Sequence, residues 1–352
     1  MKALVLEKKL DLSLRDYKIE ERLGLNDVKI KIDTVGICGS DVHYYEYGKI
    51  GNFIVREPMI LGHEASGIVI EIGKEVKNLQ IGDRVCVEPG IPNKNSKAYK
   101  MGMYNIDQEI KFWATPPVHG CLRLEVVMPS EFTFKLPDNV TFAEGAMIEP
   151  LAVGLQAVSK ARIKPGFIGL VIGCGPIGLV TALSALAGGC SKVYIADILA
   201  EKLKICERYK DLIPINIASE KLDEIIKIET SGWGVDVLFE ASGAAQAYNQ
   251  IVNNISPGGT IVIIGMPVEK VSIDITPLSV KETRIETVFR YANQYNKAIE
   301  LISSKKIDVC PLITNTFPFN QSIEAFERAA EHRPQDIKIQ INNIKWFDQK
   351  KI

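Results

Sequence analysis

The sequence predicts an α/β protein in which a mostly β region precedes a doubly wound parallel sheet. Residues 167–265 alternate strand-like and helix-like patterns, which is typical of a parallel sheet covered by helices on both faces. A glycine-rich turn follows the first of these strands, whereas residues 1–150 are dominated by strand-like segments and turns. Because 352 residues exceed the usual size of one domain, two domains are expected.

The first region has strand character at 2–7, 27–35 and 67–81. In the second of these segments, apolar residues alternate with polar ones such as Asp33, which predicts a half-buried antiparallel strand with its polar residues on the exposed face. Residues 89–121 are polar and rich in turn-forming residues, and we expect a lobe or long loop there.

The second region begins with a continuous apolar run at 167–173, as expected for a parallel strand that is buried on both faces. A helical pattern follows at 176–188, and Pro257-Gly258-Gly259 predicts a turn before the last strand of the region. The other expected elements are strands at 192–196, 235–241 and 259–265, and helices at 199–209, 220–231 and 244–255.

The tail of the chain is expected to rejoin the first domain. It has the patterns of two amphipathic helices, at 293–305 and 320–332, and of a strand at 337–341. The predicted domains are therefore 1–152 together with 290–352, and 153–289 between them.

The composition is that of a soluble globular protein and excludes several functions. The 42 Lys and Arg residues nearly balance the 43 Asp and Glu residues, which argues against a nucleic-acid partner or an acidic membrane surface. No run approaches the roughly 18 apolar residues of a membrane helix, and no signal-peptide core is evident. The seven cysteines follow no framework spacing, which indicates reduced thiols and a cytoplasmic location.

Gly173, Gly175 and Gly178 form a G-x-G-x-x-G motif, with Ile177 inside it, between a predicted strand and a predicted helix. The first glycine makes the turn, the second lets the backbone approach a pyrophosphate, and the third lets the helix pack on the strand. The phosphates would lie at the helix N-terminus, where unpaired N–H groups favour anions. The alternative is a glycine-rich connection that binds nothing, but the context favours a dinucleotide site.

Asp197, at the end of the next strand, indicates which dinucleotide is bound. Its carboxylate can accept hydrogen bonds from both ribose hydroxyls of NAD and would repel a 2′-phosphate. No Arg follows it directly, and Lys202 lies five positions further on. We therefore predict NAD rather than NADP.

Cys38, His63 and Glu64 are candidate metal ligands, because a thiolate, an imidazole and a carboxylate suit Zn²⁺ better than a hard ion such as Mg²⁺. Each residue type is also common as plain structure, and a single Cys is more often a small buried hydrophobe. The glycines that surround the pair at fixed offsets, Gly62 and Gly67 among them, favour the metal site, since glycine is used where the backbone turns tightly or approaches closely.

These residues resemble a known family. Gly62-His63-Glu64-x2-Gly67-x5-Gly73-x2-Val76 is similar to the signature of the zinc-containing medium-chain alcohol dehydrogenases. The segments CGSDVHYYEYGKIGNF, KMGMYN, FWATPP and VFRY resemble the sorbitol (polyol) dehydrogenase branch, and the resemblance runs from Met1 to about Ile341. It implies a GroES-like catalytic zinc domain and a Rossmann NAD-binding domain, with the active site in the cleft between them.

The resemblance also implies the metal ligands and a proton route. Cys38, His63 and Glu64 would hold the catalytic zinc, and Glu149 would lie at the metal, either directly or through the bound water. Ser40 and His43 match the residues that, with the cofactor ribose, pass the proton outward in the wider family. For His43 a packed or surface histidine is the alternative, and Glu149 is an alternative proton route.

Substrate and nicotinamide contacts follow from the same resemblance, since a polyol pocket needs polar partners for several hydroxyl groups. The implied substrate-binding residues are Tyr44, Phe112 as an apolar wall, Glu149, Arg290 and Tyr291. The implied cofactor-binding residues, besides the glycine motif, Asp197 and Lys202, are Ile264, Gly265, Met266, Val288, Phe289 and Arg290.

One zinc per chain and no structural zinc are predicted, because the 89–121 lobe offers only Cys121, with His119 beside it, and two ligands do not close a tetrahedral site. A lobe without a structural zinc has to be held in place by packing or by a neighbouring subunit. The resemblance implies a tetramer. The predicted function is NAD-dependent oxidation of a polyol such as sorbitol or xylitol to the ketose, with an alkoxide on zinc giving hydride to NAD. The alternatives are a dehydrogenase for a simpler secondary alcohol, diol or amino alcohol, a zinc-free quinone reductase, and a non-catalytic NAD-binding module.

Overall fold

The computed structural model describes residues 1–267 and 269–342, and the chain divides into two compact units. Unit 1 contains Met1–Glu149, Tyr295–Ser303 and the chain from Ile313 onward, and unit 2 contains Pro150–Gln294 and Ser304–Leu312. The part of the predicted first domain at 343–352 lies outside the described residues. No described helix combines the length and the apolar character that a membrane span requires.

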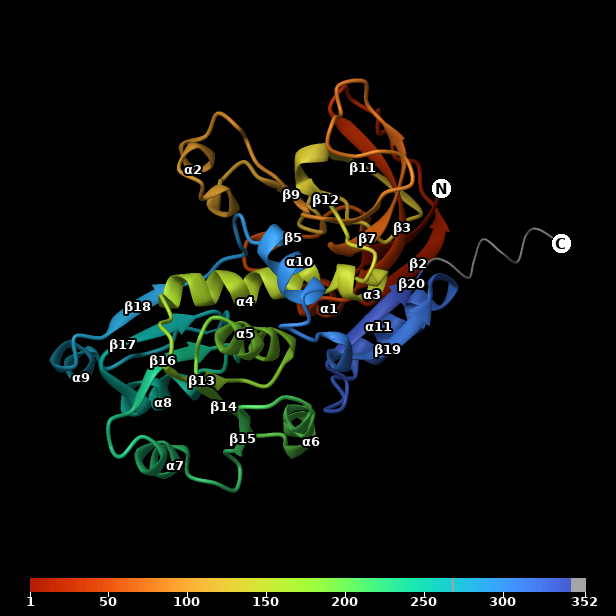
Figure 1. Ribbon diagram of the computed structural model, residues 1–352. Coiled ribbons are helices and arrows are strands. Elements are labelled where there is room, and N and C mark those ends of the chain that lie inside the picture. Colours follow the sequence, from red (N-terminus) through yellow and green to blue (C-terminus); the bar gives the residue numbers. More distant parts are fainter. Residues whose placement is uncertain (268, 343–352) are drawn as a thin grey trace. The chain divides into compact units, whose positions relative to one another are not determined.

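A large, mostly antiparallel sheet forms the centre of unit 1 (Figure 1). β3 lies in its middle and pairs with β7, β11 and β20, while β20 also pairs with β19 in parallel. The strands of this sheet are β3 (Asp27–Gly36), β7 (Glu64–Ile72), β8 (Arg84–Val87), β11 (Glu125–Pro129), β12 (Thr133–Lys135), β19 (Ile313–Pro318) and β20 (Lys338–Asn342).

The predicted strand at 27–35 is confirmed by β3, whose first residues alternate between buried and half-buried. The prediction for its last polar residue is wrong, because Asp33 is buried rather than exposed. Its carboxylate accepts a hydrogen bond from the Thr34 hydroxyl at 2.8 Å, and burial raises the pKa of this carboxyl. The strand at 67–81 was predicted too long, since β7 ends at Ile72 and turns follow.

Smaller elements complete unit 1. A second sheet has the order β2-β1-β6, and α1 follows β3 directly. The remaining strands are β1 (Lys2–Lys8), β2 (Asp11–Asp16), β4 (Lys49–Ile50), β5 (Phe53–Ile54), β6 (Met59–Ile60), β9 (Gly90–Ile91) and β10 (Lys111–Phe112). The helices are α1 (Gly39–Tyr47), α2 (Lys97–Lys100), α3 (Phe142–Ala146), α10 (Tyr295–Ser303) and α11 (Ser322–Ala330).

The lobe at 89–121 has little regular structure, as predicted, and polar contacts organise it. The Tyr104 hydroxyl donates to the buried Glu88 carboxylate at 2.8 Å, and the Tyr104 ring meets Phe132 edge-on at 6.0 Å. Within the lobe, the buried Asp107 carboxylate accepts the backbone N–H of Asn93 at 2.6 Å. These contacts join the lobe to the rest of unit 1 without a cysteine cluster.

Unit 2 is built on a six-stranded parallel sheet of order β15-β14-β13-β16-β17-β18, which confirms the doubly wound α/β prediction. Leu170 and Ile172 of β13 belong to the core that α7 and α8 cover, and α4 and α5 lie over the opposite face (Figure 1). The strands are β13 (Ile168–Ile172), β14 (Lys192–Asp197), β15 (Leu212–Asn216), β16 (Val235–Glu240), β17 (Ile255–Ile263) and β18 (Arg284–Thr287). The helices are α4 (Ile148–Ala161), α5 (Pro176–Ala187), α6 (Ala200–Leu203), α7 (Leu222–Glu229), α8 (Ala247–Asn254) and α9 (Ile275–Val280).

Two details of unit 2 correct the prediction. The turn predicted at Pro257-Gly258-Gly259 lies inside β17, because the ladder with β16 resumes only at Thr260 after the pairing of Ile255. This bulge lets β17 begin earlier than expected, with Gly258 at φ +72°. The helix predicted at 199–209 is a short α-helix followed by a 3₁₀ turn (Lys204–Arg208).

Candidate functional site

A cluster of three candidate metal ligands lies in unit 1. One ligand atom from each of Cys38, His63 and Glu64 lies within 4.8 Å of the others, and the described residues contain no second such group. His63 and Glu64 are buried and Cys38 is half-buried. The prediction that the three side chains come together is therefore met by the geometry.

Strand pairing brings these residues together although 25 positions separate Cys38 from His63. β3 ends at Gly36, which pairs with Glu64 at the start of β7, and Cys38 follows as the N-cap of α1. Gly62 turns the chain into β7 at φ +88°, a conformation that L side chains rarely adopt. A Cβ at Gly62 would also lie 2.8 Å from Leu122 Cγ, so both the conformation and the space require glycine.

Asp41 holds the two ligand-bearing segments in place, and sequence reasoning missed it. Its fully buried carboxylate accepts the backbone N–H of Cys38 at 3.2 Å and that of Gly62 at 3.0 Å. One of its oxygens lies 3.5 Å from Nδ1 of His63. The available signal was its place in the first turn of α1, where a carboxylate commonly bonds back to the N-cap.

Glu64 has a buried counter-ion, Lys338 of β20. The ammonium donates to both oxygens of the carboxylate, at 2.7 and 2.8 Å, and to the Ile37 carbonyl at 3.0 Å. Burial lowers the pKa of Lys338, but the charge and hydrogen bonds of Glu64, together with the charges of Cys38 and Glu149, raise that pKa above its ordinary value. The carboxylate occupies the space above Gly36, where an added Cβ would collide with Oε2 of Glu64.

The cluster fits a divalent zinc ion. Nδ1 of the buried His63 faces the Asp41 carboxylate at 3.5 Å, a contact that would orient the ring as a metal ligand. Burial lowers the pKa of His63, but the Asp41 carboxylate and the Cys38 thiol raise it well above its ordinary value, so the surroundings favour positive charge. A thiol, an imidazole and a carboxylate are together the donor set of a zinc site that keeps an open position.

Of the other predicted residues of unit 1, Phe112 contacts the cluster, while Ser40, His43 and Tyr44 lie on α1, which begins next to Cys38. Phe112 is buried and its ring lies 5.7 Å from the ring of His63, as expected of an apolar wall. Tyr44 is buried on α1, whereas Ser40 and His43 of the same helix are half-buried. The ring of His43 lies 4.6 Å from that of Tyr47.

Glu149 is buried at the start of α4 and is not one of the three clustered ligands. Its role at the metal, direct or through water, stays a prediction. Glu88 is another of the buried carboxyl groups of unit 1. Burial raises the pKa of Glu88 to about 7, the Tyr104 hydroxyl opposes the rise, and the charge of Glu149 adds to it. Sequence reasoning did not single out Glu88.

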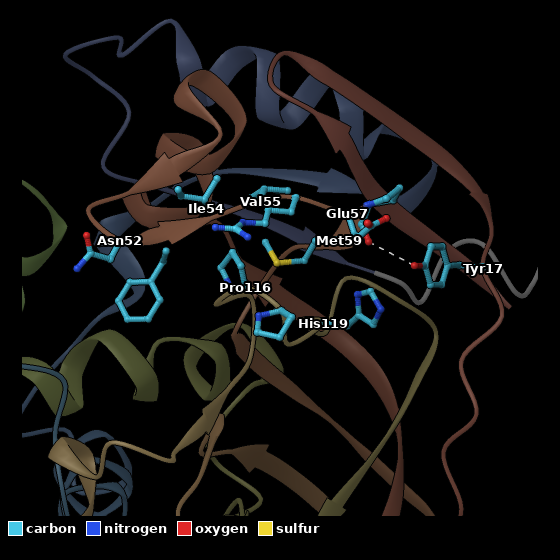
Figure 2. A pocket seen from close by; sticks show the side chains of 12 residues that line it. Tyr17, Asn52, Ile54, Val55, Glu57, Met59, Pro116 and His119 are labelled. Carbon is cyan, nitrogen blue, oxygen red and sulfur yellow. Dashed lines mark hydrogen bonds between the residues drawn. The ribbon is translucent and has the colours of Figure 1, made fainter.

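A cavity of about 550 Å³ in unit 1 contains none of the predicted site residues (Figure 2). Its wall includes His119, which was considered with Cys121 as an incomplete ligand pair. Nδ1 of His119 accepts the Ile60 N–H at 3.3 Å, and the ring meets Tyr17 edge-on at 5.1 Å. Burial lowers the pKa of His119. These contacts describe a packed histidine.

In unit 2 the glycine motif forms the turn between β13 and α5. Gly173 has φ +105°, and a Cβ there would lie 2.9 Å from Cα of Ser242. A Cβ at Gly178 would collide with the Gly173 carbonyl, so this glycine brings the helix close to the turn. Gly175 is the N-cap, and an added Cβ there would meet no atom within 4 Å. Space is therefore open at Gly175, the glycine where a pyrophosphate is predicted to approach. Ile177 lies in the first turn of α5.

Asp197 ends β14 and points its carboxylate at the glycine turn. Oδ2 accepts the Cys174 N–H at 2.8 Å, and Oδ1 accepts the Leu199 N–H at 3.0 Å. These bonds fix the side chain at the edge of the turn. Lys202 is half-buried in α6, and its carbonyl lies 3.5 Å from Sγ of Cys174.

The segments predicted to line the nicotinamide follow β17 and β18. Ile264 and Gly265 donate their N–H groups to the Glu240 carbonyl at 2.8 and 2.9 Å, and Met266 is exposed. The Val288 N–H donates to Ile263. Arg290 has φ +55° and stacks its guanidinium on Phe289 at 4.8 Å, and Tyr291 is buried.

The buried carboxylate of Glu240 holds the backbone after β16 in place at this edge of unit 2. The sequence interpretation did not single out this residue. Its Oε1 accepts the N–H groups of Ser242 and Gly243 at 2.8 and 3.0 Å, directly beside the Gly173 turn. Its position at the end of a predicted strand was the only sequence signal.

Models of known families and solved structures define the class of protein. Residues 24–138 match the alcohol dehydrogenase GroES-like domain, and residues 176–304 match the zinc-binding dehydrogenase domain. The fold is similar to the crystal structure of an Escherichia coli oxidoreductase/dehydrogenase of unknown specificity. That likeness has a TM-score of 0.93 and 33% identity, over 97% of this chain and 99% of the other. Both halves thus belong to zinc-binding dehydrogenases.

Named relatives narrow the class. The chain is 58% identical to a putative D-xylulose reductase of Rhizobium meliloti over 97% of this chain and 98% of the relative. It is 43% identical to the sorbitol dehydrogenase of Homo sapiens over 90% of this chain and 89% of the relative. The chain therefore belongs to the zinc-containing medium-chain dehydrogenase family, in its polyol dehydrogenase branch. The predicted family, fold class, enzyme class and cofactors, zinc and NAD, are confirmed by this membership.

Proposed function

We propose that this chain interconverts a sugar alcohol and its ketose, with a xylitol-type or sorbitol-type polyol as the substrate. The alcohol carbon gives a hydride to NAD⁺, the hydroxyl loses its proton, and the products are ketose, NADH and H⁺. The buried cluster of Cys38, His63 and Glu64 carries this proposal, because it fits a Lewis-acid metal in a chain whose relatives are named for xylulose and sorbitol.

Cys38, His63 and Glu64 would hold zinc, and Glu149 would contribute directly or through water. Bound there, zinc supplies a Lewis acid that favours the deprotonated alcohol. Asp41 orients His63 through Nδ1 and fixes the Cys38 and Gly62 backbone, as the outer partners of metal ligands commonly do.

Substrate orientation is proposed for Tyr44 and Phe112 in unit 1 and for Arg290 and Tyr291 in unit 2. The buried Phe112 ring beside His63 offers an apolar wall, while the tyrosines and Arg290 offer donors for several hydroxyl groups. A site built to bond hydroxyl groups rejects analogues that lack them, so simple alcohols should be poor substrates.

A screen of NADH formation tests the function. Sorbitol, xylitol, galactitol, arabinitol, threonine and butanediol are each offered with NAD⁺, with and without a zinc chelator. We expect turnover with at least one of the polyols, lost on chelation and restored by zinc. Faster turnover of butanediol or threonine than of every polyol would move the assignment to a diol or amino-alcohol dehydrogenase, and no turnover in zinc-loaded protein would reject it.

Ser40 and His43 are proposed to pass the proton outward from the site. The contact between the rings of His43 and Tyr47 also fits a merely packed histidine, so a His43→Gln variant separates the two roles. A relay role predicts lower turnover and a changed pH–rate profile, whereas a packing role leaves both unchanged.

A homotetramer and a cytoplasmic location are part of the same proposal. Both rest on the family resemblance and, for the location, on seven cysteines that are all free thiols in the structure. Light scattering on the purified protein tests the tetramer, and a monomer at working concentration would reject it.

A further inference from the structure

We infer that Lys338 is a positioning residue of the metal site, a built-in counter-cation that competes with zinc for the Glu64 carboxylate and so limits zinc affinity. This inference rests on the proposed role of Cys38, His63 and Glu64 as zinc ligands. It assigns a task to a residue from the last strand, more than 270 positions beyond the ligands in the chain.

The contacts of Lys338 show how completely it is committed to the site. An ammonium has three N–H donors, and here two go to the Glu64 carboxylate and one to the Ile37 carbonyl, which directly precedes Cys38. The side chain is 3% exposed. A buried ammonium is costly unless it is paired, so these bonds have to persist for the fold to tolerate the charge.

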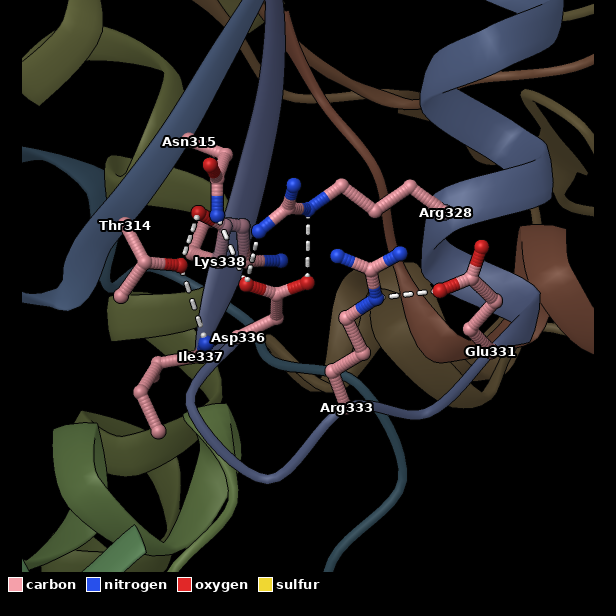
Figure 3. Close-up of polar contacts among 8 residues, drawn as sticks. All are labelled: Thr314, Asn315, Arg328, Glu331, Arg333, Asp336, Ile337 and Lys338. Atoms are coloured by element: carbon pink, nitrogen blue, oxygen red, sulfur yellow. Dashed lines mark hydrogen bonds and ion pairs between the residues drawn. The ribbon is translucent and has the colours of Figure 1, made fainter. Parts of the chain in front are cut away.

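The strand that carries Lys338 is itself fixed by a polar network (Figure 3). The Asp336 carboxylate accepts two bonds from Arg328 of α11, at 2.9 and 3.0 Å, and one from Asn315 of β19 at 2.7 Å. The Thr314 hydroxyl accepts the Ile337 N–H at 3.1 Å and donates to the Lys338 carbonyl at 3.2 Å. The backbone at Lys338 is thus anchored to β19, and the preceding Asp336 is anchored to α11.

Charge in the contact shell argues for a balancing role. With zinc bound through a Cys38 thiolate, the site would hold three negative side chains, those of Cys38, Asp41 and Glu64, and the Lys338 ammonium bonds directly to one of them. One divalent cation would bring this group of four side chains to neutrality. Without Lys338 the group would be over-negative and would attract a dication more strongly.

The carboxylate of Glu64 is therefore shared. Both of its oxygens bond to Lys338 while one of its oxygens also lies in the ligand cluster. If a neutral side chain replaces the ammonium, Glu64 can give more of its electron density to the metal. Zinc should then be held more tightly and act as a weaker Lewis acid.

Zinc release tests this inference directly. Lys338→Gln removes the charge and keeps a hydrogen-bond donor, Lys338→Arg keeps the charge, and Lys29→Gln on β3 is the matched control for loss of a lysine paired on the surface. Zinc-loaded proteins are mixed with excess dipicolinate and metal release is followed. We expect release to be about tenfold slower from Lys338→Gln, within about twofold of the parent for Lys338→Arg, and unchanged for Lys29→Gln.

Equal or faster zinc release from a folded Lys338→Gln protein would overturn the inference, since a purely structural lysine predicts weaker binding. A readout on the parent protein covers the case in which the variant does not fold. The ¹⁵Nζ signal of Lys338 should shift when zinc is added to the zinc-free protein, and a signal that does not move would reject the sharing of Glu64. If the parent retains no zinc, the proposed metal site fails instead, so the two failures are distinguishable.

Discussion

The metal cluster of unit 1 and the dinucleotide turn of unit 2 are built in opposite ways. The cluster places the half-buried Cys38 beside buried charges from distant parts of the chain, namely Asp41, Glu64 and Lys338. The turn depends on backbone shape within 173–178, with one carboxylate, Asp197, from the next strand. A site formed by backbone conformation accepts few side chains at its turn positions, but its residues are close together in the sequence. A site formed by buried charges depends on partners from several parts of the fold.

The largest effect should come from removing a ligand of the cluster. Cys38→Ala should lose bound zinc and lower kcat/KM for polyols by at least about a thousandfold, because a Lewis acid supplies several kcal/mol of stabilisation to the reacting oxygen. Cys310→Ala removes an exposed thiol and is the matched control. Zinc per chain, measured by mass spectrometry, and NADH formation are the readouts. Full zinc content in Cys38→Ala would place the metal elsewhere.

A buried charge should also make unit 1 sensitive to pH. The Glu88 pKa is raised to about 7 in the folded state, so the folded protein holds this proton more strongly than the unfolded one. Stability from this group is present below its ordinary pKa and is lost as pH rises through the folded value, by up to about 3 kcal/mol.

The Glu88→Gln substitution should remove this loss of folding stability at higher pH, because an amide does not ionise. In zinc-free protein, where the charge of the metal does not enter, the variant should gain stability over the parent as pH rises from 5 to 8. Denaturant unfolding at each pH measures the difference. A difference that does not depend on pH would mean that Glu88 does not change its ionisation in this range.

The local parts of both regions could be predicted from the sequence, and the distant supports could not. The glycine turn, Asp197 and the ligand pair His63-Glu64 are short motifs whose spacing has a physical reason. For Lys338 the sequence pattern predicts an exposed position rather than a buried one. Lys338 alternates with Ile337, Ile339 and Ile341, which would place it on a polar, exposed face, yet side chains on both faces of β20 are buried.

The burial of Asp33 and the bulge in β17 are two more features that periodicity in the sequence could not predict. Periodicity reports which residues alternate, and it does not report how many layers cover a strand. Asp33 is buried although the alternation assigned its face to solvent. Pro257-Gly258-Gly259 were predicted as a turn before the strand, but they lie at a bulge inside β17, and the pairing of Ile255 with Val235 is set by tertiary structure.

For unit 2, the comparison predicts a moderate and specific effect at Asp197. Asp197→Asn keeps an acceptor for the Cys174 N–H and removes the charge that would repel a 2′-phosphate. We expect kcat/KM for NAD to fall about thirtyfold and the preference for NAD over NADP to shrink by at least that factor. Kinetics with both cofactors are the measurement. An NADP preference in the unmodified enzyme would contradict the assignment of Asp197.

The smallest effects are expected from two substitutions in the glycine turn, which distinguish a glycine needed for the fold from one needed for cofactor binding. Gly178→Ala should destabilise unit 2 by about 1–3 kcal/mol, because its Cβ would collide with the Gly173 carbonyl and the helix would have to move. Gly175→Ala has free space and an ordinary φ of −84°, so its stability should stay within about 0.5 kcal/mol of the parent.

Gly175→Ala should still weaken NAD binding, by about tenfold, since its methyl group would occupy the space that the pyrophosphate approaches. Thermal unfolding without cofactor and NAD titration by calorimetry separate the two glycines. If both variants lose stability equally, the open space at Gly175 is not what the turn preserves. If Gly175→Ala binds NAD as well as the parent, the pyrophosphate does not approach the backbone at Gly175, and the open space there is not what the cofactor requires.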